Sequence, residues 1–388
     1  MKEKRFTKKQ MICALLLTAA LTLGGVLLLL CALLGRDGLA VMEGFVLIRT
    51  LFVEDADLKQ VADDALFAMV DATEDRWSYY LDRDWNEAQL EYEANRTTGI
   101  GVRVLYREDG LLITDVVPGG GADQAGLKAG ETLRMVEDKP LYGEDQAANT
   151  ALIKGEKETR VTVTVRAEDG TEREAEVLRG TWYDPPVRYE LLEGEVGYVR
   201  VFNFNTGVVD AFREAVDELT AQGAKALIFD LRQNGGGFID ELTEMLDYLL
   251  PKGVVFRQTT SWGWTFKKNS DASCIGLPMA VLVDEESYSC AELFAAQLRE
   301  SAGSYIVGEH TSGKGYFQYH FPMPNGGGLG LSIGRYTTGS GVSLAGVGLE
   351  PDKFISLTEE EESLFKAHWL KPAEDPGIQA ALDWLETQ

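Results

Sequence analysis

The sequence predicts a multidomain protein with an N-terminal transmembrane helix, a small helical region, an α+β domain and an α/β core. Three observations support this fold class. Residues 11–34 form a run of 24 residues without a charge. From Thr98 the chain changes to short β-rich runs separated by glycine, and from Gly197 strand and helix patterns alternate. At 388 residues the chain is too long for one hydrophobic core, so several folded units are expected.

The N-terminus is typical of a signal anchor. Residues 1–10 hold five lysines and arginines against one glutamate, and the uncharged run that follows is long enough to span a bilayer. A cleavable signal peptide has a shorter apolar region that ends in a small-x-small site. We therefore predict an uncleaved single-pass anchor at residues 11–34, with residues 1–10 in the cytoplasm and the rest of the chain outside it. A cleaved signal or a buried core helix is the alternative.

Residues 37–97 are predicted to form a small helical region, because apolar residues recur at helical spacing from position 58 to 70. Residues 98–180 are predicted to form a compact α+β domain. Its β-rich runs cover residues 99–104, 111–117, 132–136 and 161–165, with a turn, a short helix and another turn at 118–131.

Residues 181–388 are predicted to form the α/β core and a C-terminal tail. Apolar strand patterns at 197–202, 226–231, 279–283 and 306–307 alternate with helical patterns at 208–219, 241–250 and 289–298. This alternation predicts a mostly parallel sheet covered by helices.

Composition excludes several functions. The 37 Lys and Arg against 62 Asp and Glu give a net charge of −25, which argues against nucleic-acid binding. Cys13 and Cys31 lie in the apolar run, so only Cys274 and Cys290 remain for the folded part, too few for a disulfide framework. The three histidines lack His-Glu-x-x-His spacing. We expect no metal and no cofactor.

Functional groups in open α/β sheets gather beyond the carboxyl ends of the strands. Residues 230–237 follow one such strand and end in three glycines, which suits either an oxyanion-binding turn or a tight connection. Ser289 lies at the start of a predicted helix that follows another strand. It is either a helix cap or a nucleophile. Lys314 lies between two glycines. It is either a solvated surface charge or, if it is desolvated, a general base.

A family resemblance decides between these alternatives. Ser-Tyr-Ser-Cys-Ala-Glu at 287–292, followed by Gly-Lys-Gly-x-x-Gln at 313–318, resembles the signature of the carboxyl-terminal processing proteases, the S41 serine peptidases. Residues 52–82 resemble that family's N-terminal helical region, and residues 99–180 its PDZ domain. The glycine turn and residues 334–352 also resemble family segments, so the similarity covers most of the chain after the anchor.

The resemblance implies a serine endopeptidase with Ser289 as nucleophile, Lys314 as general base and Gln318 orienting Lys314. The backbone N–H groups of Gly236 and Cys290 are implied to form the oxyanion hole. A Ser–Lys pair is a known substitute for Ser–His–Asp, and the Gly-x-Ser-x-Gly elbow of many such hydrolases is absent here.

The sequence departs from the family pattern at several positions. Gly235 and His310 stand where proline is usual, and Cys290 and Ala291 where alanine and serine are common. We interpret Cys290 as a small filler rather than a rival nucleophile, because no histidine has the family spacing to activate it.

The PDZ resemblance implies how substrates are recognised. The N–H groups of Gly99, Ile100, Gly101 and Val102 would bind the carboxylate of an apolar protein C-terminus, and the peptide would add as a strand beside residues 102–105. An inhibitory PDZ that swings away from the cleft, a homodimer and an accessory regulator remain open. The alternative function is a catalytically silent PDZ scaffold that tethers extracytoplasmic partners.

Overall fold

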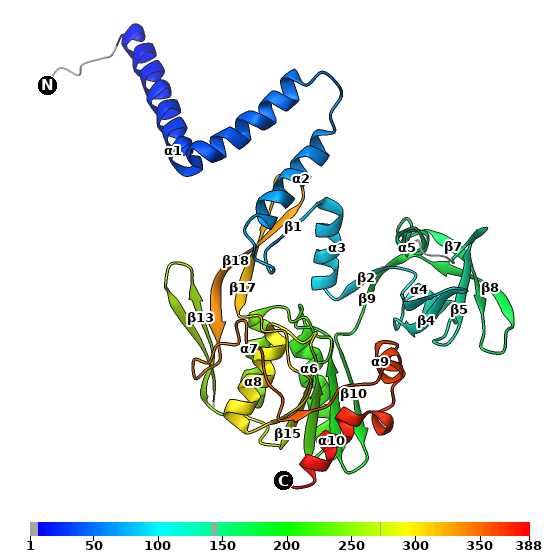
Figure 1. The fold of residues 1–388 in the computed structure, drawn as a ribbon. Coiled ribbons are helices and arrows are strands. Elements are labelled where there is room, and N and C mark those ends of the chain that lie inside the picture. The colour runs from blue at the N-terminus through cyan, green and yellow to red at the C-terminus, as the bar shows by residue number, and fades with distance from the viewer. Residues whose placement is uncertain (1–6, 142–145, 272) are drawn as a thin grey trace. The chain divides into compact units, whose positions relative to one another are not determined.

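The computed structural model describes residues 7–141, 146–271 and 273–388 (Figure 1). It divides into two compact units, one ending at Asp75 and the other beginning at Arg76.

The first unit is helical. Helix α1 covers Lys8–Leu51, but Gly35 has a non-helical backbone (φ 62°, ψ −169°) that breaks it. The predicted span at residues 11–34 ends at this break, and α1 is long and apolar enough to cross a membrane. Helix α2 covers Leu58–Asp71, as predicted, and Asp57 caps it by accepting hydrogen bonds from two backbone N–H groups. The first six residues of the predicted cytoplasmic segment lie outside the described residues.

The second unit begins with β1 (Tyr79–Leu81) and α3 (Arg83–Glu93) and continues into a strand-rich domain. Its main sheet has the order β3-β4-β5-β7-β8, and β2 pairs with β9 beside it. The bounds are β2 Arg96–Gly99, β3 Val102–Arg107, β4 Gly110–Val116, β5 Thr132–Val136, β6 Lys139–Pro140, β7 Arg160–Arg166, β8 Glu172–Leu178 and β9 Gly180–Tyr183. Two helices, α4 (Gly121–Gln124) and α5 (Gln146–Lys154), complete this domain.

The strand-rich domain has its own hydrophobic core. In β7 every second residue is buried, as expected of a sheet with one face toward a core. Leu133, Val163 and Val177 are fully buried there. Strand β3 is an edge of the main sheet, so one side of its backbone is not paired within that sheet.

The α/β core contains the predicted mostly parallel sheet. Its order is β10-β11-β12-β15-β16-β19, and only the β10–β11 pair is antiparallel. The strands are β10 Val187–Leu192, β11 Val196–Val201, β12 Ala226–Asp230, β15 Met279–Val283, β16 Tyr305–Gly308 and β19 Lys353–Phe354. Between them run α6 (Val208–Ala221), α7 (Ile239–Leu249) and α8 (Cys290–Ala302).

Helices cover both faces of this sheet. Helix α6 buries Val208, Phe212, Ala215 and Leu219, which lie on one face of the helix, against the sheet together with residues of α7 and α8. The other face packs against α10 (Pro376–Leu385). All three hydrophobic cores of the described chain lie within the second unit, so we expect that unit to fold on its own.

A second, antiparallel sheet was not predicted. It has the order β1-β18-β13-β14, and β17 also pairs with β18. Its remaining strands are β13 Gly253–Thr260, β14 Thr265–Ser270, β17 Tyr316–Pro322 and β18 Gly328–Thr337. Most of their residues are partly or fully exposed, so they lack the apolar alternation that signals a strand.

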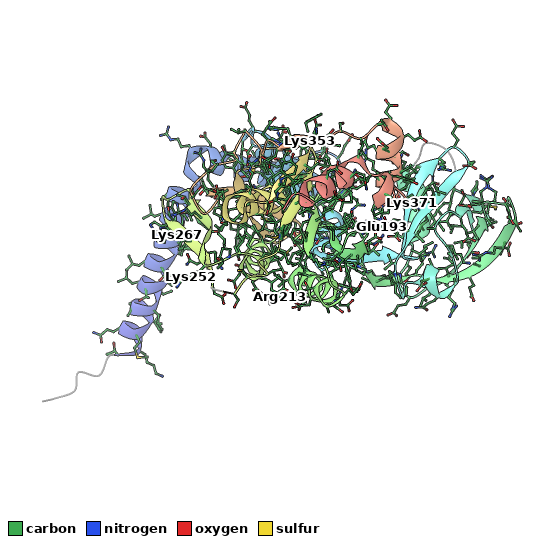
Figure 2. All side chains as sticks on the ribbon, turned by 90° about the horizontal axis from the view of Figure 1, so that it is seen from below. Glu193, Arg213, Lys252, Lys267, Lys353 and Lys371 are labelled. Carbon is green, nitrogen blue, oxygen red and sulfur yellow. The ribbon has the colours of Figure 1, made fainter. Side chains whose placement is uncertain are left out.

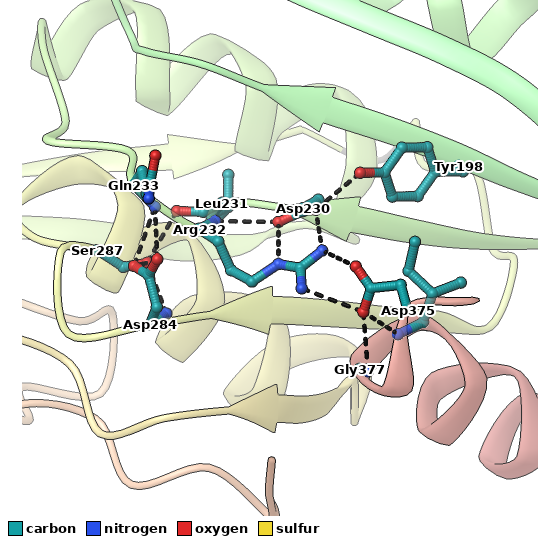
Figure 3. A network of polar contacts seen from close by, with 10 residues as sticks. Tyr198, Asp230, Leu231, Arg232, Gln233, Asp284, Ser287, Asp375 and Gly377 are labelled. Atoms are coloured by element: carbon teal, nitrogen blue, oxygen red, sulfur yellow. Dashed lines mark hydrogen bonds and ion pairs between the residues drawn. The ribbon is translucent and has the colours of Figure 1, made fainter. Parts of the chain in front are cut away.

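The C-terminal segment, with α9 (Glu359–Lys366), a 3₁₀ turn (Pro372–Glu374) and α10, is fixed to the core by a buried ion-pair network (Figure 3). Arg232 Nη2 lies 2.6 Å from Asp230 Oδ2 and 2.7 Å from Asp375 Oδ2. Asp375 also caps α10 by accepting from the N–H groups of Gly377 and Ile378. Tyr198 donates to Asp230 at 2.7 Å.

Candidate active site

Ser289 stands on a sharp turn between β15 and α8. Its backbone has φ 60° and ψ −119°, an unfavourable conformation for a residue other than glycine. This turn directly precedes Cys290, the first residue of α8, where helix N–H groups lack intrahelical acceptors. The geometry presents the Ser289 side chain at the positive end of a helix, as the sequence predicted.

The glycine turn after β12 packs directly against Ser289. Gly236 has φ 87°, and a Cβ added to it would lie 2.8 Å from Ser289 Cβ and 3.0 Å from Cys290 N. Gly237 has φ 152°, and an added Cβ would meet the Phe204 backbone at 2.4 Å. Glycine is therefore required at both positions by conformation and by space.

One of the two predicted oxyanion donors is engaged within the protein. The Gly236 N–H donates to Asn234 Oδ1 at 2.8 Å, and Asn234 is fully buried. This bond would have to open or be shared for Gly236 to serve an oxyanion, so its role stays a prediction. The Cys290 N–H, at the first position of α8, has no intrahelical acceptor.

Gly235, where the family often has proline, is explained by Tyr288. A Cβ at position 235 would lie 2.6 Å from the Tyr288 hydroxyl oxygen. The Tyr288 phenol occupies the space that a side chain at position 235 would need. The departure from the family pattern is thus coupled to an aromatic neighbour of Ser289.

Lys314 lies beside two aromatic rings. Its Nζ is 5.0 Å from the centroid of Trp77 and 5.6 Å from that of Tyr288. The two rings are 5.6 Å apart. A cation is attracted to the faces of such rings. No pattern in the sequence connects Trp77 to Lys314.

Glu292 ties the Ser289 turn to the Lys314 loop. This carboxylate is fully buried and accepts four hydrogen bonds, from Ser289 N (3.0 Å), Lys314 N (2.9 Å), Gly313 N (2.7 Å) and Thr311 Oγ1 (2.5 Å). Burial raises its pKa, and the four donors oppose that rise. The sequence alone does not single out Glu292, because an acidic residue three positions after a serine also fits a capping box.

Gln318 lies on β17 and lines the same cleft as Lys314. Its Nε2 donates to Ser332 Oγ at 2.9 Å and to Tyr316 O at 3.2 Å. These bonds orient the amide and leave its Oε1 as the acceptor for a lysine N–H. The predicted role of Gln318 in orienting Lys314 is chemically consistent with this arrangement.

Ser289, Lys314, Gln318 and Gly236 line one cleft of about 760 Å³. Other lining residues come from the segment around α3 and from the start of α7: Tyr79, Leu81, Gln89, Tyr92, Glu93, Phe238 and Ile239. Among the described residues of the strand-rich domain, none lines this cleft. The cleft is large enough for several residues of an extended peptide.

Cys290 is suited to packing rather than to nucleophilic attack. Its thiol is buried and donates to Gly237 O at 3.3 Å. Burial raises the pKa of this thiol to about 12, so it stays protonated at neutral pH. Over the described ranges, no group of three or more His, Cys, Asp and Glu is arranged to hold a metal ion.

Comparison with known proteins identifies the class. The model of peptidase family S41 matches residues 195–354. The chain is 28% identical over 321 residues to the chloroplastic C-terminal processing peptidase of Tetradesmus obliquus, covering 77% of this chain and 69% of the relative. It is 26% identical over 314 residues to the carboxy-terminal processing protease CtpA of Bacillus subtilis (strain 168), covering 80% and 67%.

The fold has a counterpart among solved structures. A structure from Bacteroides fragilis NCTC 9343, described as an S41 protease, is 18% identical and superposes with a TM-score of 0.62, over 83% of this chain and 90% of that one. This likeness concerns the fold alone.

The chain belongs to peptidase family S41, a family of serine proteases. Within this class it is a carboxyl-terminal processing peptidase, as the sequence motifs predicted.

Proposed function

We propose that this protein is a membrane-anchored, extracytoplasmic serine endopeptidase in which Ser289 is the nucleophile and Lys314 the general base. The observation that carries the proposal is the buried Glu292 carboxylate, which binds the backbones of both residues and holds them at one cleft. A nucleophile and its base must be held in fixed mutual geometry, and this clamp supplies it.

The reaction follows from the groups at the cleft. Ser289 Oγ attacks the substrate carbonyl while its proton passes to neutral Lys314. The Trp77 and Tyr288 rings stabilise the ammonium that forms. The Cys290 N–H, with that of Gly236 if it is released from Asn234, stabilises the oxyanion. Lys314 then gives the proton to the departing amine, and water hydrolyses the acyl-enzyme.

The strand-rich domain at residues 98–180 is proposed to act as a PDZ module. Edge strand β3 can accept a substrate C-terminus as an added strand, next to the backbone of residues 99–102. Ile100 would contribute only its backbone, because its side chain is buried in the domain core. The substrates would be proteins with apolar C-termini.

Membrane attachment is proposed to rest on the part of α1 that precedes Gly35. The basic residues before it would stay in the cytoplasm, which places the catalytic unit outside.

Cleavage assays test the proposal. The protein should cleave an unstructured substrate that ends in apolar residues, and should cleave the same substrate more slowly when it ends in two aspartates. Ser289→Ala and Lys314→Ala should each abolish cleavage, whereas the nearby Ser312→Ala and the distant Lys353→Ala should leave it intact. A chelator should have no effect. Wild-type activity in Ser289→Ala or in Lys314→Ala would overturn the assignment.

A further inference from the structure

The hairpin formed by β13, its tip and β14, residues 253–270, exposes large aromatic side chains to solvent. Trp262 and Trp264 at its tip are 82% and 64% exposed, and Phe266 next to them is 50% exposed. The two indole rings contact each other edge to face at 6.3 Å. Soluble surfaces rarely expose tryptophans side by side, and such a patch marks an interaction site.

The same segment is positively charged, although the protein as a whole is strongly acidic. Residues 252–270 hold four basic residues and no acidic one, in a chain whose net charge is −25. Lys252 and Lys267 lie on this segment in Figure 2 and form no ion pair within the described residues. Lys268 pairs with Asp240 at 2.9 Å, but both groups are exposed, so the pair is weak. Arg257 donates to Gly339 O.

The aromatic side chains of this surface do not line the cleft. Neither tryptophan nor Phe266 is among the residues that line the Ser289 cleft. Exposed tryptophans flanked by lysines are the composition of a protein surface that enters the boundary between lipid headgroups and acyl chains. Within the same chain, α1 supplies a helix that can cross a bilayer.

We infer that the tip of the β13–β14 hairpin, with Trp262 and Trp264, inserts into the interface of an anionic bilayer while Lys267 binds lipid headgroups. The inference rests on the proposed anchor only because the anchor keeps the catalytic unit close to a bilayer. It adds a second attachment point, through which the orientation of the cleft over the membrane would be set.

The length of the hairpin between Trp264 and Lys267 agrees with insertion of its tip into the bilayer interface. Strand residues rise about 3.3 Å each, so Lys267 lies roughly 10 Å behind Trp264 along β14. Interfacial side chains enter about 5–10 Å into the headgroup and acyl boundary, which leaves Lys267 at headgroup level. Each lysine near an anionic lipid surface strengthens membrane binding about fivefold.

The experiment uses the full chain in nanodiscs that contain 30% phosphatidylglycerol and a phosphatidylcholine brominated on its acyl chains. All seven tryptophans follow residue 76, and only Trp85, Trp262 and Trp264 are exposed. Bromine should quench part of the tryptophan fluorescence. Trp262→Phe with Trp264→Phe should remove the quenched part, whereas Trp85→Phe should not.

The charge variants keep Trp262 and Trp264, so the same fluorescence signal reports on them. Lys267→Glu should lower the quenched fraction at least fivefold, with an unchanged thermal melt. Lys353→Glu changes the net charge equally but lies elsewhere, and should have no effect. Failure to co-purify with nanodiscs would refute the anchor and not the hairpin, so vesicle flotation of the unit from Arg76 onward then tests the hairpin directly. Co-purification without hairpin-dependent quenching, or burial of the hairpin in a dimer, would overturn the inference.

Discussion

At the scale of single residues, Glu292 has the largest expected influence on catalysis without touching substrate. Glu292→Gln replaces one carboxylate oxygen with an NH₂ group, which faces N–H donors and leaves them without an acceptor. Losing hydrogen bonds to a charged group costs about 1.5–3 kcal/mol, so we expect kcat to fall about tenfold to a hundredfold with little change in KM. Steady-state kinetics with Glu286→Gln, an exposed neighbour, as the control would measure this split. An unchanged kcat would show that the clamp does not position Ser289 and Lys314.

Cys290 is expected to be dispensable as a thiol. Cys290→Ala removes one weak hydrogen bond to Gly237 O, so activity should stay within about threefold of wild type. Iodoacetamide should label Cys274, which is exposed, and leave Cys290 and activity untouched. Mass spectrometry of the labelled peptides checks this, and thiol-dependent inactivation would instead favour a cysteine nucleophile.

The motifs allowed Ser289, Lys314 and Gln318 to be predicted from sequence, because their spacing is local and distinctive. Trp77 could not be connected to Lys314, because more than two hundred residues separate them and only the folded sheet brings them together. The engagement of Gly236 by Asn234 was also beyond prediction, since a side-chain hydrogen bond leaves no sequence pattern.

At the scale of structural elements, the glycine turn and the Ser289 turn constrain each other. Gly235→Ala places a Cβ within 2.6 Å of the Tyr288 hydroxyl oxygen, so the ring must shift, and that ring contacts Lys314. We expect kcat to fall several-fold, roughly the effect of losing one exposed cation–π contact. Tyr288→Phe in the Gly235→Ala background removes the nearest atom and should restore part of the loss. Wild-type kinetics for Gly235→Ala would show that Tyr288 does not set the position of Lys314.

The parallel sheet and its helices were predicted because buried strands are continuous apolar runs and α6 is clearly amphipathic. The antiparallel sheet that carries Gln318 was not, because most of the residues in its strands are exposed and β1 pairs with β18 across some 250 residues. Long-range pairing of weakly patterned strands is decided by tertiary packing, which local periodicity does not report.

At the scale of the whole molecule, the ion-pair network in Figure 3 joins the C-terminal helix to the catalytic core. Asp375→Ala removes both the cap of α10 and one partner of Arg232, a buried charge. Breaking a buried pair on one side costs about 3–5 kcal/mol, and we expect that loss in the free energy of unfolding measured with urea. Asp375→Asn keeps an acceptor for the cap and should lose less.

Stability of the unit from Arg76 onward should also depend on pH through Asp284. Desolvation raises the pKa of this carboxyl to about 6 from an ordinary value of 3.8, although both oxygens accept from Gln233 N at 2.9 Å. Between pH 4 and 6 the folded state therefore binds this proton more tightly than the unfolded state does. Stability from this group is complete below about pH 4 and is lost as pH rises through 6.

The raised pKa corresponds to at most about 3 kcal/mol, and partial exposure of Asp284 lowers the expected effect to about 1–2 kcal/mol. Asp284→Asn lacks this titration and keeps one carbonyl acceptor for Gln233. Urea unfolding of both proteins at several pH values should show the variant gaining relative stability from pH 4 to pH 7, because only the wild type must carry a desolvated charge at the higher pH. Stability curves that run parallel over this range would mean that Asp284 is ionised in the folded protein well below pH 6, held so by the N–H groups of the loop it organises.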